Sequence, residues 1–271
     1  KKIFKEADEN LNYPISKLIL EGPENDLQLT KNTQPAILTV SYSIFKVLKD
    51  EFNYKLDSFK YFAGHSLGEY SALVCSNSLN FNDALYLLHE RGKAMQEAVP
   101  VGKGAMLAVL GMNLRDVEVF ISKIKTTQVI EIANDNADGQ IIISGEIEVI
   151  KKLQELLKND KKKSILLPVS APFHCSLMKP AAISMEDKIN NTNFHDPKFE
   201  IINNVTAKAE KNSMSIKKLL IDQIFSTVKW RESLINMSEA GVKNFIEIGP
   251  GKTLVGMVKR TIKDSNCFIS K

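Results

Sequence analysis

The sequence predicts an α/β fold in which a large domain with a mainly parallel sheet carries an inserted, smaller module. Apolar strand-like runs alternate with helix-like stretches in the outer parts of the chain, which is typical of a parallel sheet covered by helices on both faces. Residues 64–68 read Gly-His-Ser-Leu-Gly and lie between a strand-like run and a helix-like stretch. Between residues 101 and 170 the order becomes βαββαβ, the arrangement of a ferredoxin-like subdomain. We therefore expect a large domain from residues 1–100 and 171–271 and a small subdomain from residues 101–170.

The first hundred residues are predicted to be mostly helical. Apolar positions at spacings of three and four predict helices over about 4–11, 33–48, 67–73 and 80–95. Residues 21–25 contain Gly and Pro and indicate a loop. The second helix is expected to begin at Thr33 or Gln34, because the next residue is Pro35 and proline is tolerated in a first helical turn. Asn80 is the expected cap of the last of these helices.

The Gly-x-Ser-x-Gly turn predicts a nucleophile at Ser66. A tight turn between strand and helix would lift Ser66 above the sheet edge, and we expect Gly64 and Gly68 to be glycine because a side chain at either position would collide with backbone. A helix beginning at Leu67 would place free N–H groups beside Ser66, where an acyl oxyanion develops. The alternative is a Gly/Ser loop that only caps a helix.

The middle of the chain is predicted to form the small subdomain. Its expected strands and helices cover residues 105–110 (strand), 117–124 (helix), 129–132 and 141–144 (strands), 147–157 (helix) and 165–169 (strand). The polar residues 134–139 are interpreted as a turn between two strands.

The remaining chain returns to the helix and strand alternation of the large domain. The expected elements are helices over 177–189, 216–225 and 231–240, strands over 199–203 and 245–248, and a last helix after the turn at 249–251. The triplet Gly251-Lys252-Thr253 does not form a phosphate-binding loop, because that motif requires glycine where Ile246 stands.

Composition is that of a globular enzyme or binding protein. The chain has 271 residues, 44% hydrophobic and 25% charged, with a formal charge of +4. No apolar run is long enough to span a membrane, the charged start is unlike a signal peptide, and the lysine clusters lack interleaved aromatic residues. Cys75, Cys175 and Cys267 are too far apart for a disulfide framework or a zinc site. We expect a cytoplasmic monomer without metal, cofactor, nucleic acid or membrane partner.

A serine nucleophile requires a base, and histidine is the usual one. The chain offers His65, His89, His174 and His195. His65 would point away from its neighbour Ser66, whereas His174 stands in a proline-containing loop where the small subdomain rejoins the large one. Domain junctions are common places for ligand clefts, which favours His174 while the others stay open.

Arg91 occupies a core position on its predicted helix. It shares the stripe with Ala84, Leu87, Leu88 and Met95. A buried guanidinium requires an anion, which is either a structural carboxylate or a carboxylate on a substrate. Position alone favours the structural pair.

Four segments together resemble malonyl-CoA:acyl carrier protein transacylases of dissociated fatty acid synthesis. They are residues 64–70 (GHSLGEY), the helix of Arg91, residues 173–181 (FHCSLMKPA) and residues 247–252 (EIGPGK). The order of the motifs matches that family over nearly the whole chain. The resemblance implies an α/β-hydrolase-like core with an inserted ferredoxin-like subdomain. It also implies transfer of malonyl from malonyl-CoA to the phosphopantetheine thiol of acyl carrier protein through a malonyl-serine.

The resemblance also implies roles for individual residues. Ser66 would accept the malonyl group, His174 would be its base, and Arg91 would bind the free malonate carboxylate through its bidentate fork. The Leu67 N–H would line the oxyanion hole, and Gln34 would lie in the acyl pocket.

Three further positions match the family. The backbone carbonyl of Gln223 would orient the histidine, and Asn136 and Asn204 would line the pocket.

One departure from the family pattern concerns the start of the chain. The family begins with a strand and a Gly-Gln-Gly-Ser-Gln loop whose first glutamine supplies a second oxyanion N–H, and the sequence given contains no such loop. Loss of one such donor typically costs on the order of 10² to 10³ in rate. Two alternatives to the transferase follow: a serine esterase or thioesterase, and an impaired acyltransferase that only docks acyl carrier protein.

Overall fold

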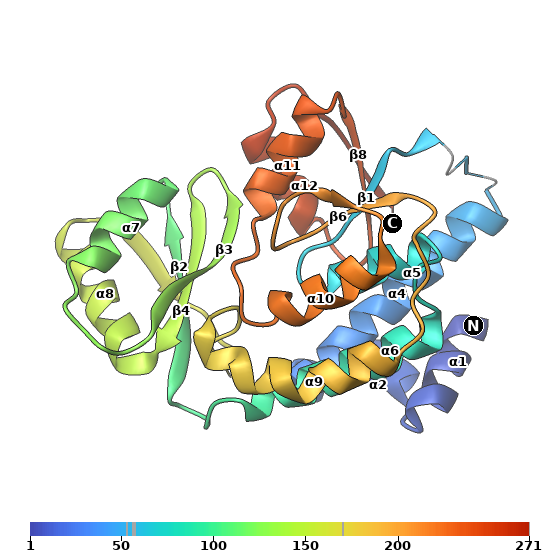
Figure 1. The fold of residues 1–271 in the computed structure, drawn as a ribbon, viewed down its shortest axis with the longest axis horizontal. Helices are drawn as coiled ribbons and strands as arrows, with labels where there is room; N and C mark the ends of the chain where they lie inside the picture. Colours follow the sequence, from blue (N-terminus) through green and yellow to red (C-terminus); the bar gives the residue numbers. More distant parts are fainter. Residues whose placement is uncertain (53, 56–57, 170, 271) are drawn as a thin grey trace.

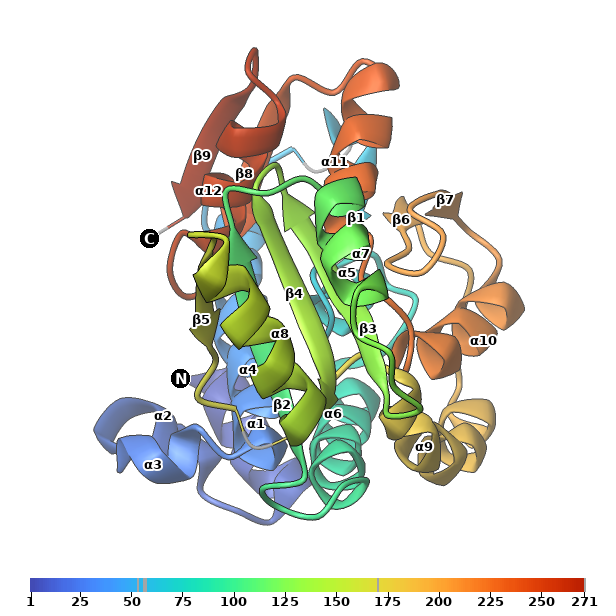
Figure 2. The same cartoon turned by 90° about the vertical axis from the view of Figure 1, so that its left-hand side faces the viewer.

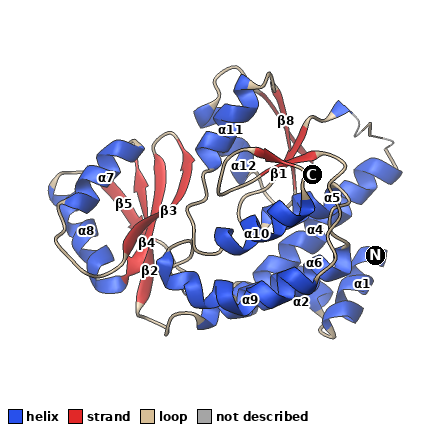
Figure 3. Cartoon of the chain, viewed as in Figure 1, coloured by secondary structure: helices blue, strands red, loops and turns tan. Residues whose placement is uncertain are grey.

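The computed structural model describes residues 1–52, 54–55, 58–169 and 171–270. Ser170, the expected end of the small subdomain, lies outside the described residues. Figure 1 and Figure 3 show a group of strands with helices on one side and a larger, mostly helical part on the other. The chain therefore has α/β architecture.

Helices form most of the first hundred residues. They are α1 (Lys2–Leu11), α2 (Ile15–Glu21), α3 (Glu24–Leu27), α4 (Thr30–Asp50), α5 (Gly68–Cys75) and α6 (Phe81–Glu97), with the short strand β1 (Tyr61–Ala63) before α5. Asn80 caps α6 as expected, since its side chain accepts a hydrogen bond from Asp83 N. The predicted loop at 21–25 is wrong except for Gly22 and Pro23, because α2 and α3 occupy its two sides.

The start predicted for α4 is also wrong. The helix begins at Thr30, so that Pro35 lies inside it. Proline has no N–H for the carbonyl of Lys31 four residues earlier, and the imidazole of His89 supplies a donor instead, with Nδ1 3.0 Å from the Lys31 oxygen. A contact from α6 thus satisfies the acceptor that proline leaves open in α4.

A four-stranded antiparallel sheet with two helices forms the middle of the chain. Its elements are β2 (Gly104–Leu110), α7 (Leu114–Ser122), β3 (Ile130–Ala137), β4 (Gln140–Glu146), α8 (Ile147–Asn159) and β5 (Lys163–Leu166). The strands lie in the order β3-β4-β2-β5, and Figure 2 shows α7 and α8 on one face of them. Apolar residues of these elements form their own core, which includes Leu107, Ile143 and Leu153.

The turn predicted at 134–139 is wrong in its first half. Asn134 to Ala137 continue β3, and only Asp138 and Gly139 form the turn. The polar side chains of Asp135 and Asn136 are buried, and each has a distant partner, Arg231 and His65 respectively. These tertiary contacts outweigh the local preference of Asn and Asp for turns.

The rest of the chain contains η2 (Ser176–Met178), α9 (Lys179–Asn191), β6 (Glu200–Ile202), β7 (Ala209–Glu210), α10 (Ser213–Gln223), α11 (Trp230–Glu239), β8 (Asn244–Ile248), α12 (Thr253–Thr261) and β9 (Asn266–Ser270). β1 pairs in parallel with β6, and β8 pairs in parallel with β9. Within the described residues these pairs belong to separate sheets, so the single mainly parallel sheet that we expected is divided.

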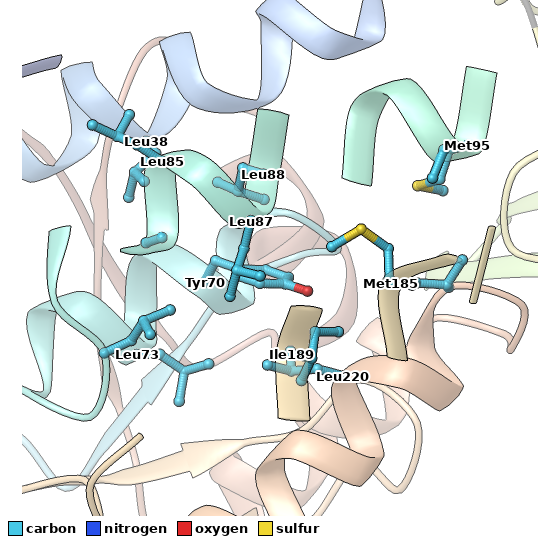
Figure 4. Close-up of a cluster of buried hydrophobic side chains, with 14 of the residues drawn as sticks. Leu38, Tyr70, Leu73, Leu85, Leu87, Leu88, Met95, Met185, Ile189 and Leu220 are labelled. Atoms are coloured by element: carbon cyan, nitrogen blue, oxygen red, sulfur yellow. The ribbon is translucent and has the colours of Figure 1, made fainter. Parts of the chain in front are cut away.

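The largest core lies between the helices. Figure 4 shows Leu38 of α4, Tyr70 of α5, Leu87 of α6, Ile189 of α9 and Leu220 of α10 around one apolar region. All of these side chains are fully buried. At about 1.5–3 kcal/mol for each large apolar side chain removed from water, this cluster fixes α5 and α6 against each other. No helix within the described residues combines the length and apolar character that a membrane crossing requires.

Candidate active site

Ser66 lies on a strained turn between β1 and α5. Its φ is 51°, in the left-handed region that residues with a side chain rarely adopt. Gly64 permits this turn, because a Cβ there would stand 1.9 Å from the carbonyl oxygen of Gly68. The prediction that Gly68 must also be glycine is wrong, since a Cβ at that position meets no atom within 4 Å. One glycine, not two, makes room for the turn.

The structure brings His174 to Ser66 across 108 residues of sequence. Ser66 Oγ lies 2.8 Å from His174 Nε2, and His174 Nδ1 lies 2.9 Å from the carbonyl oxygen of Gln223. A carbonyl oxygen can only accept, so Nδ1 carries the hydrogen and Nε2 is free to take the serine proton. The Gln223 carbonyl occupies the place that a carboxylate has in a Ser-His-Asp triad.

The environment of His174 keeps the imidazole neutral. Burial, followed by the positive charge of Arg91, lowers the pKa of His174 to about 3. At neutral pH the ring is therefore an acceptor for the Ser66 proton. The other three histidines have other partners: His65 bonds to Asn136, His89 to the Lys31 carbonyl and His195 to Asn193.

Arg91 reaches the same site from α6 and is 1% exposed. Its Nη2 donates to Ser66 Oγ at 3.1 Å and to Gln223 Oε1 at 2.8 Å, and its Nη1 donates to Gln34 Oε1 at 2.7 Å. Its Nε has no hydrogen-bond partner among the residues that the structure describes. Among the described residues, no carboxylate lies within salt-bridge distance of the guanidinium, so the structural ion pair is not found and the cation remains available to an anion.

Leu67 follows the nucleophile as the N-cap of α5, which begins one residue later than predicted. No described residue accepts a hydrogen bond from its backbone N–H. The dipole of α5 adds positive potential at the same place. This N–H is therefore suited to an oxyanion on the acyl group attached to Ser66.

Asn204 holds the serine turn from outside. Its Oδ1 accepts from Ser66 N at 2.7 Å, and its Nδ2 donates to the Gly64 carbonyl at 2.8 Å. Both the oxygen and the nitrogen of the side-chain amide thus form hydrogen bonds to the backbone of the turn, and neither is directed at a ligand. Asn136 lies against the back of the turn, where its Oδ1 is 2.7 Å from His65 Nε2.

Sequence reasoning missed three residues beside the site. Glu69 and Asn203 are buried and hydrogen-bonded to each other, and Trp230 packs edge-on against His65 with ring centroids 5.7 Å apart. An acidic residue in a first helical turn is ordinary, because it complements the helix dipole, so Glu69 carries no local signal of its role. For Trp230 the only signal was that it is the single tryptophan of the chain.

Comparison with known proteins identifies the family of this site. The acyl transferase domain matches residues 4–269. A malonyl CoA-acyl carrier protein transacylase of Bacillus subtilis (strain 168) is 43% identical over 262 residues, which are 96% of this chain and 81% of that protein. The chain belongs to the acyl transferase family, among the malonyl CoA-acyl carrier protein transacylases. It is therefore an acyltransferase.

Solved structures of transacylases share this fold. The acyl-carrier-protein-S-malonyltransferase from Bartonella henselae superposes with a TM-score of 0.96 at 39% identity, covering 99% of this chain and 86% of that one. A malonyl-transacylase solved in complex with a type II PKS acyl-carrier protein gives a TM-score of 0.94 at 36% identity, covering 99% and 86%. The expected α/β fold class and the expected family are thus those of the transacylases.

Proposed function

We propose that the chain transfers malonyl from malonyl-CoA to the phosphopantetheine thiol of acyl carrier protein through a malonyl ester of Ser66. The observation that carries this proposal is the position of Ser66 Oγ, 2.8 Å from a neutral imidazole and 3.1 Å from a buried guanidinium that forms no salt bridge with any described residue. An esterase needs the first contact but not the second. The names of the relatives support the same substrate and acceptor.

In the first half-reaction, Ser66 Oγ gives its proton to His174 Nε2 and attacks the thioester carbon. The oxyanion lies at the Leu67 N–H, and the Gln223 carbonyl supports the imidazolium through Nδ1. The bond between carbon and sulfur breaks, and the proton on His174 goes to the departing thiolate. Malonyl remains on Ser66 as an ester, with its free carboxylate paired with Arg91.

In the second half-reaction, the thiol of acyl carrier protein replaces coenzyme A. Its proton goes to His174, its sulfur attacks the malonyl-Ser66 ester, and Ser66 Oγ leaves with the proton that His174 returns. Both halves use the same base and the same oxyanion donor. Two successive half-reactions imply ping-pong kinetics.

The domain arrangement belongs to this proposal as well. The strand order of the middle sheet and its separate core support a ferredoxin-like subdomain over residues 101–170. The parallel pairs and the serine turn support an α/β-hydrolase-like domain from residues 1–100 and 171–271. A cytoplasmic location, a monomeric state and independence of any cofactor stay predictions.

The intact mass after a short incubation with malonyl-CoA tests the intermediate. We expect one malonyl adduct, mapped by peptide mass to Ser66, and release of that adduct on addition of the phosphopantetheine-bearing carrier protein. In Ser66→Ala the adduct is expected to be absent. An adduct on Cys75 or Cys175, or one that persists in Ser66→Ala, would contradict the assignment. Release to water as fast as to the carrier protein would favour the esterase alternative.

A further inference from the structure

Glu69 is a buried carboxylate that the reaction described above does not use. It lies one turn after Ser66 at the start of α5 and is 1% exposed. Its oxygens accept hydrogen bonds from Asn203 Nδ2 at 2.6 Å, Gln223 Nε2 at 2.7 Å and Asn204 N at 3.2 Å. All three groups are donors. A carboxylate whose described hydrogen-bond partners are all donors fits the site in its ionised form.

Gln223 connects this carboxylate to the base and to the cation. Its side-chain Nε2 faces Glu69 and the Ser66 carbonyl, so that Oε1 is turned toward Arg91 Nη2. Its main-chain carbonyl accepts from His174 Nδ1. Of the two acceptors of Nε2, the Glu69 carboxylate is the nearer, at 2.7 Å against 3.1 Å for the Ser66 carbonyl. Without the carboxylate, the amide would lose the charged acceptor that favours this orientation over the flipped one.

Asn204 connects the same carboxylate to the nucleophile. Glu69 Oε2 accepts from Asn204 N, while the Asn204 side chain spans the serine turn from Ser66 N to the Gly64 carbonyl. The base, the cation and the nucleophile are thus each one residue away from Glu69.

We propose that Glu69 is a positioning residue, which acts through Gln223 and Asn204 to hold His174, Arg91 and Ser66 in register for acyl transfer. The inference rests on the proposed function, because it assigns Glu69 to the same reaction. Groups that orient metal ligands typically change activity by about 10- to 100-fold when they are altered, and we expect the same scale for a residue that orients groups in contact with substrate. A residue with this role must stay ionised for its three donors to remain paired.

If Glu69 acts in its ionised form, its titration should appear in the pH dependence of the malonylation rate. Burial raises the pKa of Glu69 to about 7, although its three donors and the charge of Arg91 oppose the rise. The titratable groups that face it are Arg91 of α6 and Tyr70 of α5, whereas α10 and the loop after β6 present amides. Below that pH the carboxyl gains a proton that must point at an N–H donor. His174 stays neutral there, because its pKa is lowered to about 3.

The test compares Glu69→Gln with the wild-type chain and with Glu247→Gln. Glu247 lies in β8, and its carboxylate also accepts from backbone N–H groups, those of Leu254 and Val255 at the start of α12. The single-turnover rate of Ser66 malonylation is measured between about pH 5 and about pH 9, the window in which such a carboxyl titrates. We expect the wild-type rate to fall as the pH drops through 7. Glu69→Gln is expected to be about 10- to 100-fold slower at high pH and to lack this fall, and Glu247→Gln to match the wild type.

A second variant is expected to shift the pH dependence of the malonylation rate while it keeps the Glu69 carboxylate. Asn203 donates to Glu69 but touches neither Ser66, His174 nor Arg91 through any described hydrogen bond. Asn203→Ala removes one donor to the ionised form, so the acid limb of the rate profile is expected to shift to higher pH. This readout also holds if Glu69→Gln does not fold.

The outcomes separate the two proposals. If the wild-type chain forms no malonyl-Ser66, the proposed function fails. If the wild type is malonylated but Glu69→Gln keeps the wild-type rate and acid limb, the positioning role alone is overturned. An acid limb that stays in place in Asn203→Ala would overturn it as well.

Discussion

Within the part of the chain that the structure describes, the guanidinium of Arg91 makes hydrogen bonds to oxygens that carry no formal charge. Its partners are two amide oxygens and the Ser66 hydroxyl, and its side chain is almost completely buried. Burying an unpaired cation is costly, and here burial also lowers the pKa of Arg91. In the function that we propose, the free carboxylate of malonate pairs with this guanidinium. On that proposal, Arg91 is the residue expected to separate a malonyl transferase from a general serine acyl enzyme.

Arg91→Ala is expected to reverse the preference between malonyl-CoA and acetyl-CoA. Malonyl transfer should lose about 2–5 kcal/mol in kcat/KM, the scale for removing one partner of a buried charge pair, while acetyl transfer holds or rises. Arg91→Lys should recover part of the malonyl rate, since an ammonium cannot form two parallel hydrogen bonds. The measurement is kcat/KM for both thioesters with acyl carrier protein as acceptor.

Lys93 provides the control for this comparison. It lies on the same helix but pairs with Glu90 at the surface, so Lys93→Ala should leave both activities unchanged. Equal loss of malonyl and acetyl transfer in Arg91→Ala would make Arg91 a structural residue.

The sequence predicts some functional residues and conceals others for a physical reason. Ser66 and Arg91 stand out locally, one through its turn and the other through a charge on an apolar stripe. His174 was favoured by its place at a junction and by the family resemblance, and its contact with Ser66 depends on the folded chain. Glu69 lies in the segment 64–70 that resembles the family, but nothing in the sequence indicated a role for it, because its hydrogen-bond donors come from residues 203, 204 and 223.

At the scale of elements, the close approach of α4 and α6 brings Gln34 to Arg91. Gly92 permits this approach, because a Cβ there would lie 2.5 Å from Lys31 Cα and 2.6 Å from the Thr30 carbonyl oxygen. These contacts are with backbone, which cannot rotate away as a side chain can. Any side chain at residue 92 would therefore push the two helices apart next to the cation of the site.

Gly92→Ala is expected to destabilise the fold by about 1–3 kcal/mol, the usual cost of overpacking, although alanine is the better helix former. The rate of Ser66 malonylation should fall with it, since Arg91 precedes Gly92. Gly256→Ala is the matched control: Gly256 also lies inside a helix, α12, but a Cβ there meets nothing within 4 Å. This variant should gain about 0.5–1 kcal/mol. The measurement is urea unfolding of both variants, and equal stability of the two would contradict the packing argument.

Elements with a strong periodic pattern were predicted more reliably than those fixed by distant contacts. The helices α1, α6 and α8 follow their apolar stripes, with ends close to those expected. The start of α4 depends on His89, and the length of β3 depends on Arg231. Both residues are far away in the sequence from the element that they contact. The helix and strand propensities of neighbouring residues cannot predict contacts with residues so far away in the sequence. For the same reason β9, which exists as a strand through its pairing with β8, was not expected.

At the scale of the whole molecule, one strand of the middle sheet is fastened to the segment before α11. Asp135 N donates to the Val228 carbonyl, Val228 N donates to the Ala133 carbonyl, and Thr227 Oγ1 donates to the Ile132 carbonyl. Arg231 adds a bidentate ion pair, with Nε 2.9 Å from Asp135 Oδ1 and Nη2 2.8 Å from Asp135 Oδ2. This connection lies next to Asn136 and so next to the His65 side of the serine turn.

The ion pair between Arg231 and Asp135 is expected to contribute more than a surface pair. Asp135 is almost fully buried and Arg231 about one quarter exposed, so the coupling energy should lie between those of exposed and buried pairs, at about 1–3 kcal/mol. A double-mutant cycle of Arg231→Ala and Asp135→Asn, followed by urea unfolding, measures it. The pair of Lys123 and Asp160 is the control, because its atoms are 3.9 Å apart and both side chains are about half exposed. Its coupling should not exceed about 0.5 kcal/mol.

Since Asn136 follows Asp135 in β3, Arg231→Ala should also slow malonylation of Ser66, whereas Lys123→Ala should not. A coupling in the first cycle as small as in the second would mean that the backbone bonds alone hold the middle sheet to the site.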